Sequence, residues 1–351
     1  MWQVVGQDRV VSILQRGLEQ GTLSHAYMLV GSPHVGKMTV ALNLAQAVNC
    51  DSPEPPCGDC QSCQKVIAGN HADVQVINLT QNGDVGEAKL ISIDQVRDMQ
   101  HSASLPPFEG KCKVFIIEDA ELLSIEAANS LLKTLEEPTD KTLFLLLTTN
   151  EKFLPETVVS RCQRLKLIPV PSPGVEEALH RRWGIEPKQA KLLARLSKGC
   201  LGWAIAAASG EQILQERAEK LENLYEVIRA DTEARFGHAA QLATQYTQDR
   251  AAVQERLDLW LGWWRDLLLV KAACPDYVAN IDQLNMLNSV AGQYTMEQAR
   301  DCIGSIRAAE GQLRRNANPR LVLEVLMLDM PGKTESNRTG LKTRGSVKDG
   351  G

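Results

Sequence analysis

Apolar residues in the first half of the chain follow two different spacings. Val10, Val11, Leu14 and Leu18 recur every three to four positions, which predicts a helix between residues 7 and 20 that ends near Gly21. Helical spacing returns from Val40 to Val48 and from Ala127 to Leu135. Four other apolar runs are continuous, as in parallel strands covered on both faces; they span residues 26–30, 74–77, 113–117 and 143–147. This alternation predicts an α/β fold with a parallel sheet.

The pattern changes after Ile168, where the segment PVPSPG forms a proline-rich joint. Residues 175–208 are then typical of a small helical unit and residues 211–329 of longer amphipathic helices. The run 260–270 contains three tryptophans and is strongly apolar, which favours core packing over base stacking. The last residues, 332–351, contain almost nothing to bury, and we expect them to be disordered. The predicted domains are residues 1–170, 171–209 and 210–330, followed by a tail at 331–351.

Composition limits the class of protein. The chain has 351 residues, 44% of them hydrophobic, and a formal net charge of -5. This charge argues against a protein whose main task is to coat nucleic acid, although a local basic patch stays possible. No stretch approaches the roughly 20 apolar residues that span a bilayer. We therefore expect a cytoplasmic protein.

Four of the nine cysteines are clustered, at Cys50, Cys57, Cys60 and Cys63. In a reducing compartment four thiolates at this spacing predict a closed structural zinc site rather than disulfides. We expect His71, eight residues further on, to be a surface loop residue and no ligand. The other cysteines are interpreted as small buried apolar residues; they are Cys112, Cys162, Cys200, Cys274 and Cys302.

The segment GSPHVGKMT matches a phosphate-binding loop from Gly31 through Gly36 to Lys37 and lies between a predicted strand and a predicted helix. Its backbone N–H groups would hold phosphate oxygens and Lys37 would reach the terminal phosphates of ATP or ADP. The alternative is a glycine turn with a solvated lysine.

The residue after Lys37, which normally supplies a hydroxyl to magnesium, is Met38. Thr39 lies one residue later, about 100° around the helix, and cannot replace that hydroxyl without a shift of the loop. We expect magnesium to be held weakly or not at all. Nucleotide binding tolerates this change better than hydrolysis does.

Two acids follow the strand that ends at Ile117. A hydrolytic site of this type presents Asp and then Glu there, whereas this chain has Glu118 followed by Asp119. Exchanging the two lengths displaces both carboxylates by about a methylene, and catalysis is sensitive to displacements of that size. The alternative is a pair of acids at the edge of a sheet with no catalytic part.

These residues and several longer segments resemble the bacterial DNA polymerase III clamp-loader subunits of the AAA+ superfamily. The resemblance covers nearly the whole chain outside the tail and is closest to the delta-prime branch, with the tau/gamma motor subunits as relatives. It is carried by the segments VVGQ (4–7), SHAYMLVG (24–31), AANSLLKTLEEP (127–138), LLLTTN (145–150), LPETVVSRCQ (154–163) and RRNANPRLVLEVL (314–326).

The resemblance implies roles for individual residues. Val5 would lie near the adenine, and Thr149 would be a sensor-one residue that reads the terminal phosphate. Arg161 of the SRC motif would be an arginine finger acting on a neighbouring subunit's ATP; its alternative is a surface salt bridge beside Glu156. Where motor subunits place a sensor-two arginine, this chain has Gly202.

The resemblance also implies the domains: an AAA+ domain with a zinc module at about 50–70, a small helical lid domain, and an all-α collar domain that oligomerises. The apolar faces of residues 211–329 fit an isolated helical bundle equally well.

Three functional hypotheses follow. In the first, the chain is a stator with weak or absent ATP hydrolysis that joins tau/gamma and delta subunits in a ring and donates Arg161 while the complex loads the sliding clamp onto primer-template DNA, at the nucleoid during replication. In the second, it is a motor subunit in which Thr39 and the Glu118-Asp119 pair act with altered geometry. In the third, it is an unrelated zinc-containing nucleic-acid adaptor, which fits the cysteines and no other motif.

Overall fold

The computed structural model describes residues 2–79, 90–210 and 212–331, and the chain divides into two compact units, Met1–Ala208 and Ser209–Gly351. The predicted disorder of residues 332–351 lies outside the described residues. Within them, no helix has the length and apolar character needed to cross a membrane.

The first unit is built on one parallel sheet of five strands in the order β2-β3-β4-β1-β5, which confirms the predicted α/β class. β1 lies between β4 and β5, and Val30 at its end is level with Thr148 of β4. The strands are β1 (Ala26–Val30), β2 (Val74–Ile77), β3 (Lys113–Ile117), β4 (Thr142–Thr148) and β5 (Gln163–Lys166).

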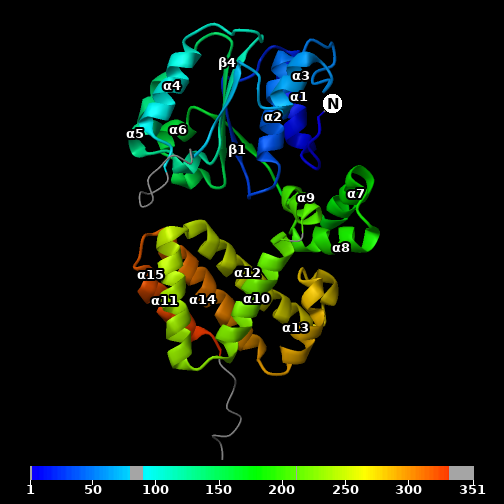
Figure 1. Cartoon of the computed structure of the whole chain (residues 1–351), viewed down its shortest axis with the longest axis vertical. Helices are drawn as coiled ribbons and strands as arrows, with labels where there is room; N and C mark the ends of the chain where they lie inside the picture. Colours follow the sequence, from blue (N-terminus) through cyan, green and yellow to red (C-terminus); the bar gives the residue numbers. More distant parts are fainter. Residues whose placement is uncertain (1, 80–89, 211, 332–351) are drawn as a thin grey trace, which may run out of the picture. The chain divides into compact units, whose positions relative to one another are not determined.

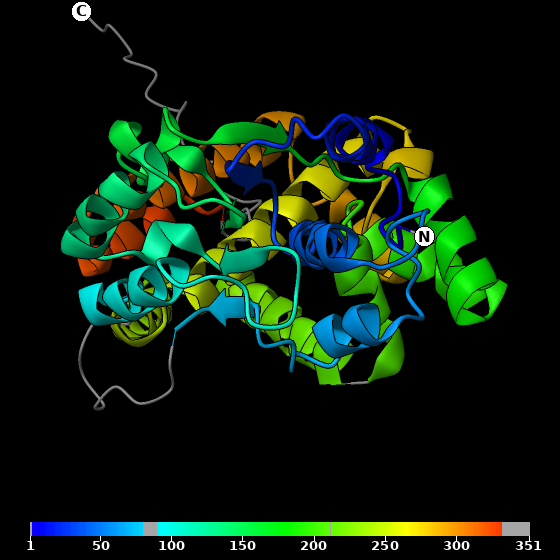
Figure 2. The ribbon, with the colours of Figure 1, turned by 90° about the horizontal axis from the view of Figure 1, so that it is seen from above.

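Apolar side chains cover both faces of this sheet. Every residue of β3 and β4 is buried, and the rings of Phe115 and Phe144 stack with centroids 5.4 Å apart. One apolar cluster joins the sheet to α4 and α5 and the other joins it to α1 and α2, so the sheet lies between two helical layers (Figures 1 and 2). The helices are α1 (Asp8–Glu19), α2 (Lys37–Asn49), α3 (Gln61–Ile67), α4 (Ile93–Ala103), α5 (Ile125–Glu136) and α6 (Glu156–Val159), with 3-10 turns η1 (Ala120–Leu122) and η2 (Glu151–Phe153).

β5 was not among the predicted strands. Of its four residues only Leu165 is buried, because β5 is an edge strand, and a single apolar position carries no readable period. Three short helices follow the proline-rich joint within the same unit; they are α7 (Ser172–Trp183), α8 (Pro187–Leu196) and α9 (Leu201–Ser209).

The second unit is entirely helical in its described residues. Trp260, Trp263 and Trp264 are almost completely buried, which confirms core packing for the tryptophan-rich run. Trp263 and Trp264 pack edge to face with each other, and they do the same with Tyr225 and Tyr294, respectively. Its elements are α10 (Gln212–Arg229), α11 (Thr232–Gln248), α12 (Arg250–Lys271), η3 (Pro275–Tyr277), η4 (Ile281–Gln283), α13 (Leu284–Ala291), α14 (Met296–Arg314) and α15 (Pro319–Asp329).

Candidate functional site

The phosphate loop begins where β1 ends. Gly31 donates its backbone N–H to the Thr148 carbonyl across 3.1 Å, which ties the loop to the end of β4. A Cβ at Gly31 would lie 2.9 Å from Val35 Cγ1 and 3.0 Å from the Leu167 carbonyl oxygen. The chain can turn here only because residue 31 has no side chain.

The loop delivers the N-terminus of α2 to an open position. Gly36, with φ +106°, precedes the first helical residue, and no side chain caps the helix there. The first N–H groups of a helix carry partial positive charge and favour an anion. Lys37 adds a full charge, and its Nζ donates to the carbonyls of Gly31 (2.7 Å) and Ser32 (3.1 Å). These residues fit a phosphate group.

Lys37 lies in an anionic and half-buried environment. Burial lowers the pKa of its ammonium group, and the carboxylates of Glu121, Asp119 and Glu118, in decreasing order of effect, oppose that change. The site therefore contains more negative charge than the predicted acid pair alone supplies.

The Met38 side chain packs against the apolar cluster between the sheet, α1 and α2. A thioether is a poor ligand for magnesium, which prefers oxygen. Thr39 is half-buried in the first turn of the same helix. The structure thus has no hydroxyl at the position directly after Lys37, as the sequence indicated.

The acids after β3 differ in environment. Glu118 is half-buried, whereas Asp119 is exposed and adopts a left-handed conformation with φ 47°. Neighbouring atoms still shield the Asp119 carboxyl from water, and this shielding, followed by the charge of Glu121, raises its pKa.

Sequence analysis missed Glu121, in η1. Its Oε1 accepts the backbone N–H of Thr149 at 3.0 Å and the Thr149 hydroxyl at 2.5 Å. The sequence contains a third acid close to the predicted pair, in the run Glu118-Asp119-Ala-Glu121. A motif that specifies only the two adjacent acids does not include it. Thr149 therefore lies beside the phosphate loop with both donors already bound by a carboxylate.

The first turn of α9 lies against the phosphate loop. Gly202 donates its N–H to the His34 carbonyl at 3.0 Å, and a Cβ at this position would lie 2.9 Å from the same oxygen. Any side chain at position 202, including an arginine, would therefore require the loop or the helix to move. Glycine here permits a direct contact between the two backbones.

The N-terminal segment is anchored to the joint after β5. The Gln7 amide donates to the Ile168 carbonyl at 2.7 Å and accepts the Ile168 N–H at 3.2 Å. Val4 packs on the same apolar cluster as Met38, and Val5 is half-buried beside it. The segment thus borders the loop, and the nucleotide-contact role expected of Val5 stays a prediction.

Arg161, just after α6, is held at the surface with one-third of its side chain exposed. One guanidinium nitrogen donates to the Thr157 carbonyl at 2.8 Å, and the other pairs with Glu136 at the end of α5. The ion-pair partner is therefore Glu136 and not Glu156, because α5 and α6 pack together and bring the two side chains into contact.

The four clustered cysteines converge on one point, as the sequence predicted. Their sulfurs all lie within 4.8 Å of one another, with separations of 3.5 Å for Cys50 and Cys57 and 3.9 Å for Cys57 and Cys63. Zinc–sulfur bonds of about 2.3 Å place tetrahedral ligand sulfurs about 3.8 Å apart. The spacing fits a metal bound by four thiolates.

Backbone N–H groups point at these sulfurs. Cys60 N–H donates to Cys57 Sγ at 3.3 Å, and Cys63 N–H donates to Cys60 Sγ at 3.4 Å, which lowers the pKa of Cys60 to about 6. Burial raises the pKa of Cys63 to about 12. A bound cation would remove the repulsion that opposes ionising all four thiols together.

The cysteine cluster is joined to the sheet by buried polar residues. Asn49 Oδ1 accepts the N–H groups of Lys111 (2.8 Å) and Cys112 (2.9 Å), just before β3. His71 is buried and not a surface residue as predicted, because its ring bonds both the Ser62 hydroxyl in α3 (3.1 Å) and the Asp73 N–H (3.1 Å).

The interpretation of the remaining cysteines as buried was correct for two of the five. Cys162 and Cys302 are buried, and burial raises the pKa of the Cys162 thiol to about 12. The others are only partly buried, because they lie at element ends; they are Cys112, Cys200 and Cys274.

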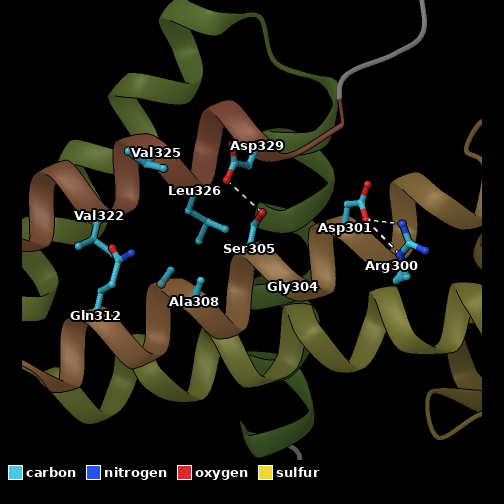
Figure 3. A pocket seen from close by; sticks show the side chains of 11 residues that line it. Arg300, Asp301, Gly304, Ser305, Ala308, Gln312, Val322, Val325, Leu326 and Asp329 are labelled. Atoms are coloured by element: carbon cyan, nitrogen blue, oxygen red, sulfur yellow. Dashed lines mark hydrogen bonds and ion pairs between the residues drawn. The ribbon is translucent and has the colours of Figure 1, made fainter.

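The second unit has a groove of about 470 Å³ between α14 and α15. Figure 3 shows Ser305 of α14 bonded to Asp329 of α15, a contact of 3.0 Å, and the Arg300–Asp301 pair near one end. Small residues, including Gly304 and Ala308, line its floor. The lining holds no grouping typical of catalysis, so the candidate chemistry lies in the first unit.

The sheet order, phosphate loop and helical cover define an AAA+ type α/β domain, joined to a helical unit. Two family models match most of the chain: the model described as "DNA polymerase III, delta subunit" matches residues 6–171, and the one described as "DNA polymerase III, delta subunit, C terminal" matches residues 213–331. The chain belongs to this DNA polymerase III clamp-loader family.

Individual relatives agree with this assignment. DNA polymerase III subunit delta' of Bacillus subtilis is 28% identical over 92% of this chain and 95% of its own length. Subunit tau of Escherichia coli is 34% identical over 59% of this chain, but the match spans only 33% of tau. Subunit tau of Bacillus subtilis is 26% identical over 93% of this chain and 60% of its own length.

Two solved structures from Thermotoga maritima are also similar. A DNA polymerase III gamma subunit-related protein is 19% identical, with 92% of this chain and 98% of that chain covered and a TM-score of 0.43. The RuvB Holliday junction branch migration motor is 19% identical, with 58% and 61% covered and a TM-score of 0.40.

Replacing Cys60 by Ser tests the metal cluster. We expect the purified wild-type chain to contain one metal ion per molecule and Cys60→Ser to lose it, because a hydroxyl is a much weaker ligand than a thiolate. Elemental analysis measures the metal, and Cys274→Ser, which changes a cysteine outside the cluster, is the control. A metal-free wild-type protein purified without chelators would contradict the site.

Proposed function

We propose that the chain is a delta-prime-like stator of the DNA polymerase III clamp loader. In this role it hydrolyses little or no ATP and donates Arg161 to the ATP site of a neighbouring subunit while the complex loads the sliding clamp onto primer-template DNA. One contrast carries the proposal: the chain's own phosphate loop has lost hydrolytic groups, while Arg161 is displayed at the surface.

The altered groups support the stator at four separate places. Met38 packs into the core where a magnesium ligand is needed, and Gly202 leaves no room for a sensor-two arginine. The order of Glu118 and Asp119 is reversed, and Thr149, the proposed sensor-one residue, is bound by Glu121. Each change weakens hydrolysis and leaves the phosphate-binding backbone intact.

The displayed arginine supports the role in trans. An arginine finger stabilises charge that develops on a transferred phosphoryl group and is worth roughly 10³–10⁵ in rate in other enzymes. Arg161 is partly exposed, and its carboxylate partner Glu136 is about half exposed. A neighbour's phosphate can therefore replace Glu136 without unfolding any element.

We assign zinc to the cysteine cluster. All four ligands are cysteines, and the chain offers no open coordination position among them, which is typical of structural zinc. The metal would hold the loop between α2 and α3, and ATP or ADP would bind at Gly31, Gly36, Lys37 and the Thr39 turn without tightly bound magnesium.

The proposed organisation follows the family. Residues 1–170 form the AAA+ domain, 171–209 the lid and 210–330 a collar that joins tau/gamma and delta subunits in a ring, in the cytoplasm and at the nucleoid during replication. Support for the collar comes from α15, where Leu321, Val325 and Leu328 recur at helical spacing and are each more than half exposed. An exposed row of apolar side chains of this kind is suited to packing against a helix of a neighbouring subunit.

An active tau/gamma-like motor is the second candidate. The similarity to tau subunits and the retained Lys37, Glu118 and Asp119 favour it.

Arg161→Ala tests the finger. We expect the variant to fold and join the complex, while ATP-driven clamp loading by the reconstituted complex becomes slower by roughly tenfold or more, because one transition-state charge loses its partner. Arg164→Ala, which removes an exposed arginine three residues away, should load at the wild-type rate. Equal loading by all three proteins would eliminate the finger role.

ATP turnover by the isolated chain separates stator from motor. We expect phosphate release by the wild-type chain to equal that of Lys37→Ala, because the magnesium ligand and sensor-two arginine are missing. Release that is well above background and depends on Lys37 would favour the motor.

Charged substitutions on α15 test the collar. Leu321→Glu combined with Val325→Glu should leave the unit folded, since both side chains are exposed, and should weaken association with the other subunits by about tenfold or more in analytical ultracentrifugation. Gln241→Glu, an exposed charge change on α11, is the control. Unchanged association would remove this face from the interface.

A further inference from the structure

Glu121 occupies a central position beside the phosphate loop. η1 brings it from the end of β3 to the end of β4, where a single oxygen, Oε1, accepts both donors of Thr149. The neighbouring residue, Thr148, accepts the N–H of Gly31 from the loop. The carboxylate of Glu121 is therefore fixed at the strand edge where the phosphate loop begins.

The second oxygen of Glu121 has no comparable partner. Oε2 is buried and makes no hydrogen bond with any of the described residues. Water screens a charge on a buried carboxylate oxygen only weakly. The charge acts on Lys37 more strongly than that of any other acid, including Glu118 and Asp119.

This position is unfavourable for a terminal phosphate. The lysine of a phosphate loop reaches the outer phosphates of a nucleotide, while the loop backbone and helix N-terminus hold the inner ones. The phosphate nearest Lys37 Nζ and Thr149 would be the one closest to Glu121. It would meet a like charge, and Thr149 would have no free donor to offer.

The two neighbouring acids do not share this geometry. Both donors of Thr149 bond to Glu121, and neither Asp119 nor Glu118 accepts from them. Asp119 has a left-handed backbone, and its side chain caps no helix. Glu126→Gln makes the same change at an exposed residue in the first turn of α5, outside the site, and is the matched control for a change at Glu121.

We propose that Glu121 is a specificity-determining residue that makes this phosphate loop selective for nucleoside diphosphates, by holding Thr149 and placing a fixed negative charge where the terminal phosphate of a triphosphate would bind. The proposal rests on nucleotide binding by the loop, which the proposed function includes. It explains how a stator can keep a nucleoside diphosphate in its phosphate loop and take no part in the ATP hydrolysis cycle of the motor subunits.

Glu121→Gln is the decisive variant, because the amide keeps an oxygen for Thr149 and removes the charge. Calorimetry with ADP and with the non-hydrolysable triphosphate AMP-PNP, each with magnesium and with EDTA, gives the dissociation constants. We expect wild type to bind ADP about tenfold more tightly than AMP-PNP. Glu121→Gln should bind AMP-PNP about tenfold more tightly than wild type does, and ADP within about twofold; Glu126→Gln should keep the wild-type ratio.

Three outcomes overturn the proposal: no preference for ADP in wild type, an unchanged ratio in both Glu121→Gln and Glu121→Ala, or an equal change in Glu126→Gln. Absence of binding by wild type and variants overturns it too, yet leaves the stator intact, since donation of Arg161 needs no nucleotide in this loop. Clamp loading by Arg161→Ala tests that role separately.

Discussion

The parallel pairing of β1, β3 and β4 is the constraint on which the site depends. In a parallel sheet all strands end at one edge, so the loops that follow them meet although they are far apart in sequence. Here the phosphate loop follows β1, the acids follow β3 and Thr149 follows β4, which lies between the other two. The bond from Gly31 N–H to the Thr148 carbonyl fixes this meeting point. A slip of register would separate Lys37 from Glu121 and Thr149 together.

α2 connects this edge with the cysteine cluster. The helix begins at Lys37 and ends at Asn49, directly before Cys50, so its 13 residues separate the two sites by about 20 Å. Asn49 also binds the chain just before β3. The cluster thus stabilises the far end of the helix whose near end presents N–H groups to phosphate. Under the proposed zinc assignment, the metal would help to position α2.

Sequence patterns predicted the features that depend on near neighbours. Continuous apolar runs located β1 to β4, and cysteine spacing predicted that the four cysteines converge. Features that depend on distant partners were missed. β5 has one buried residue because it lies at an edge. His71 is buried where its ring bonds to Ser62 and Asp73, and Arg161 pairs with Glu136 from another helix. Glu121 was overlooked since its importance comes from Thr149, 28 residues away. The spacing of apolar residues along the chain carries no information about such a pairing.

The two cations of the proposed function occupy opposite environments. Lys37 is half-buried, bonded to its own loop and surrounded by acids, so its charge is already matched within the subunit. Arg161 is partly solvated, and its pair with Glu136 lies at the surface, where such pairs are worth about 0–1 kcal/mol. Exchange of Glu136 for the more highly charged phosphate of a neighbour therefore costs little. The charge of Lys37 is thus compensated within the subunit, whereas Arg161 can change its partner at little cost. This arrangement is suited to acting on another subunit's nucleotide.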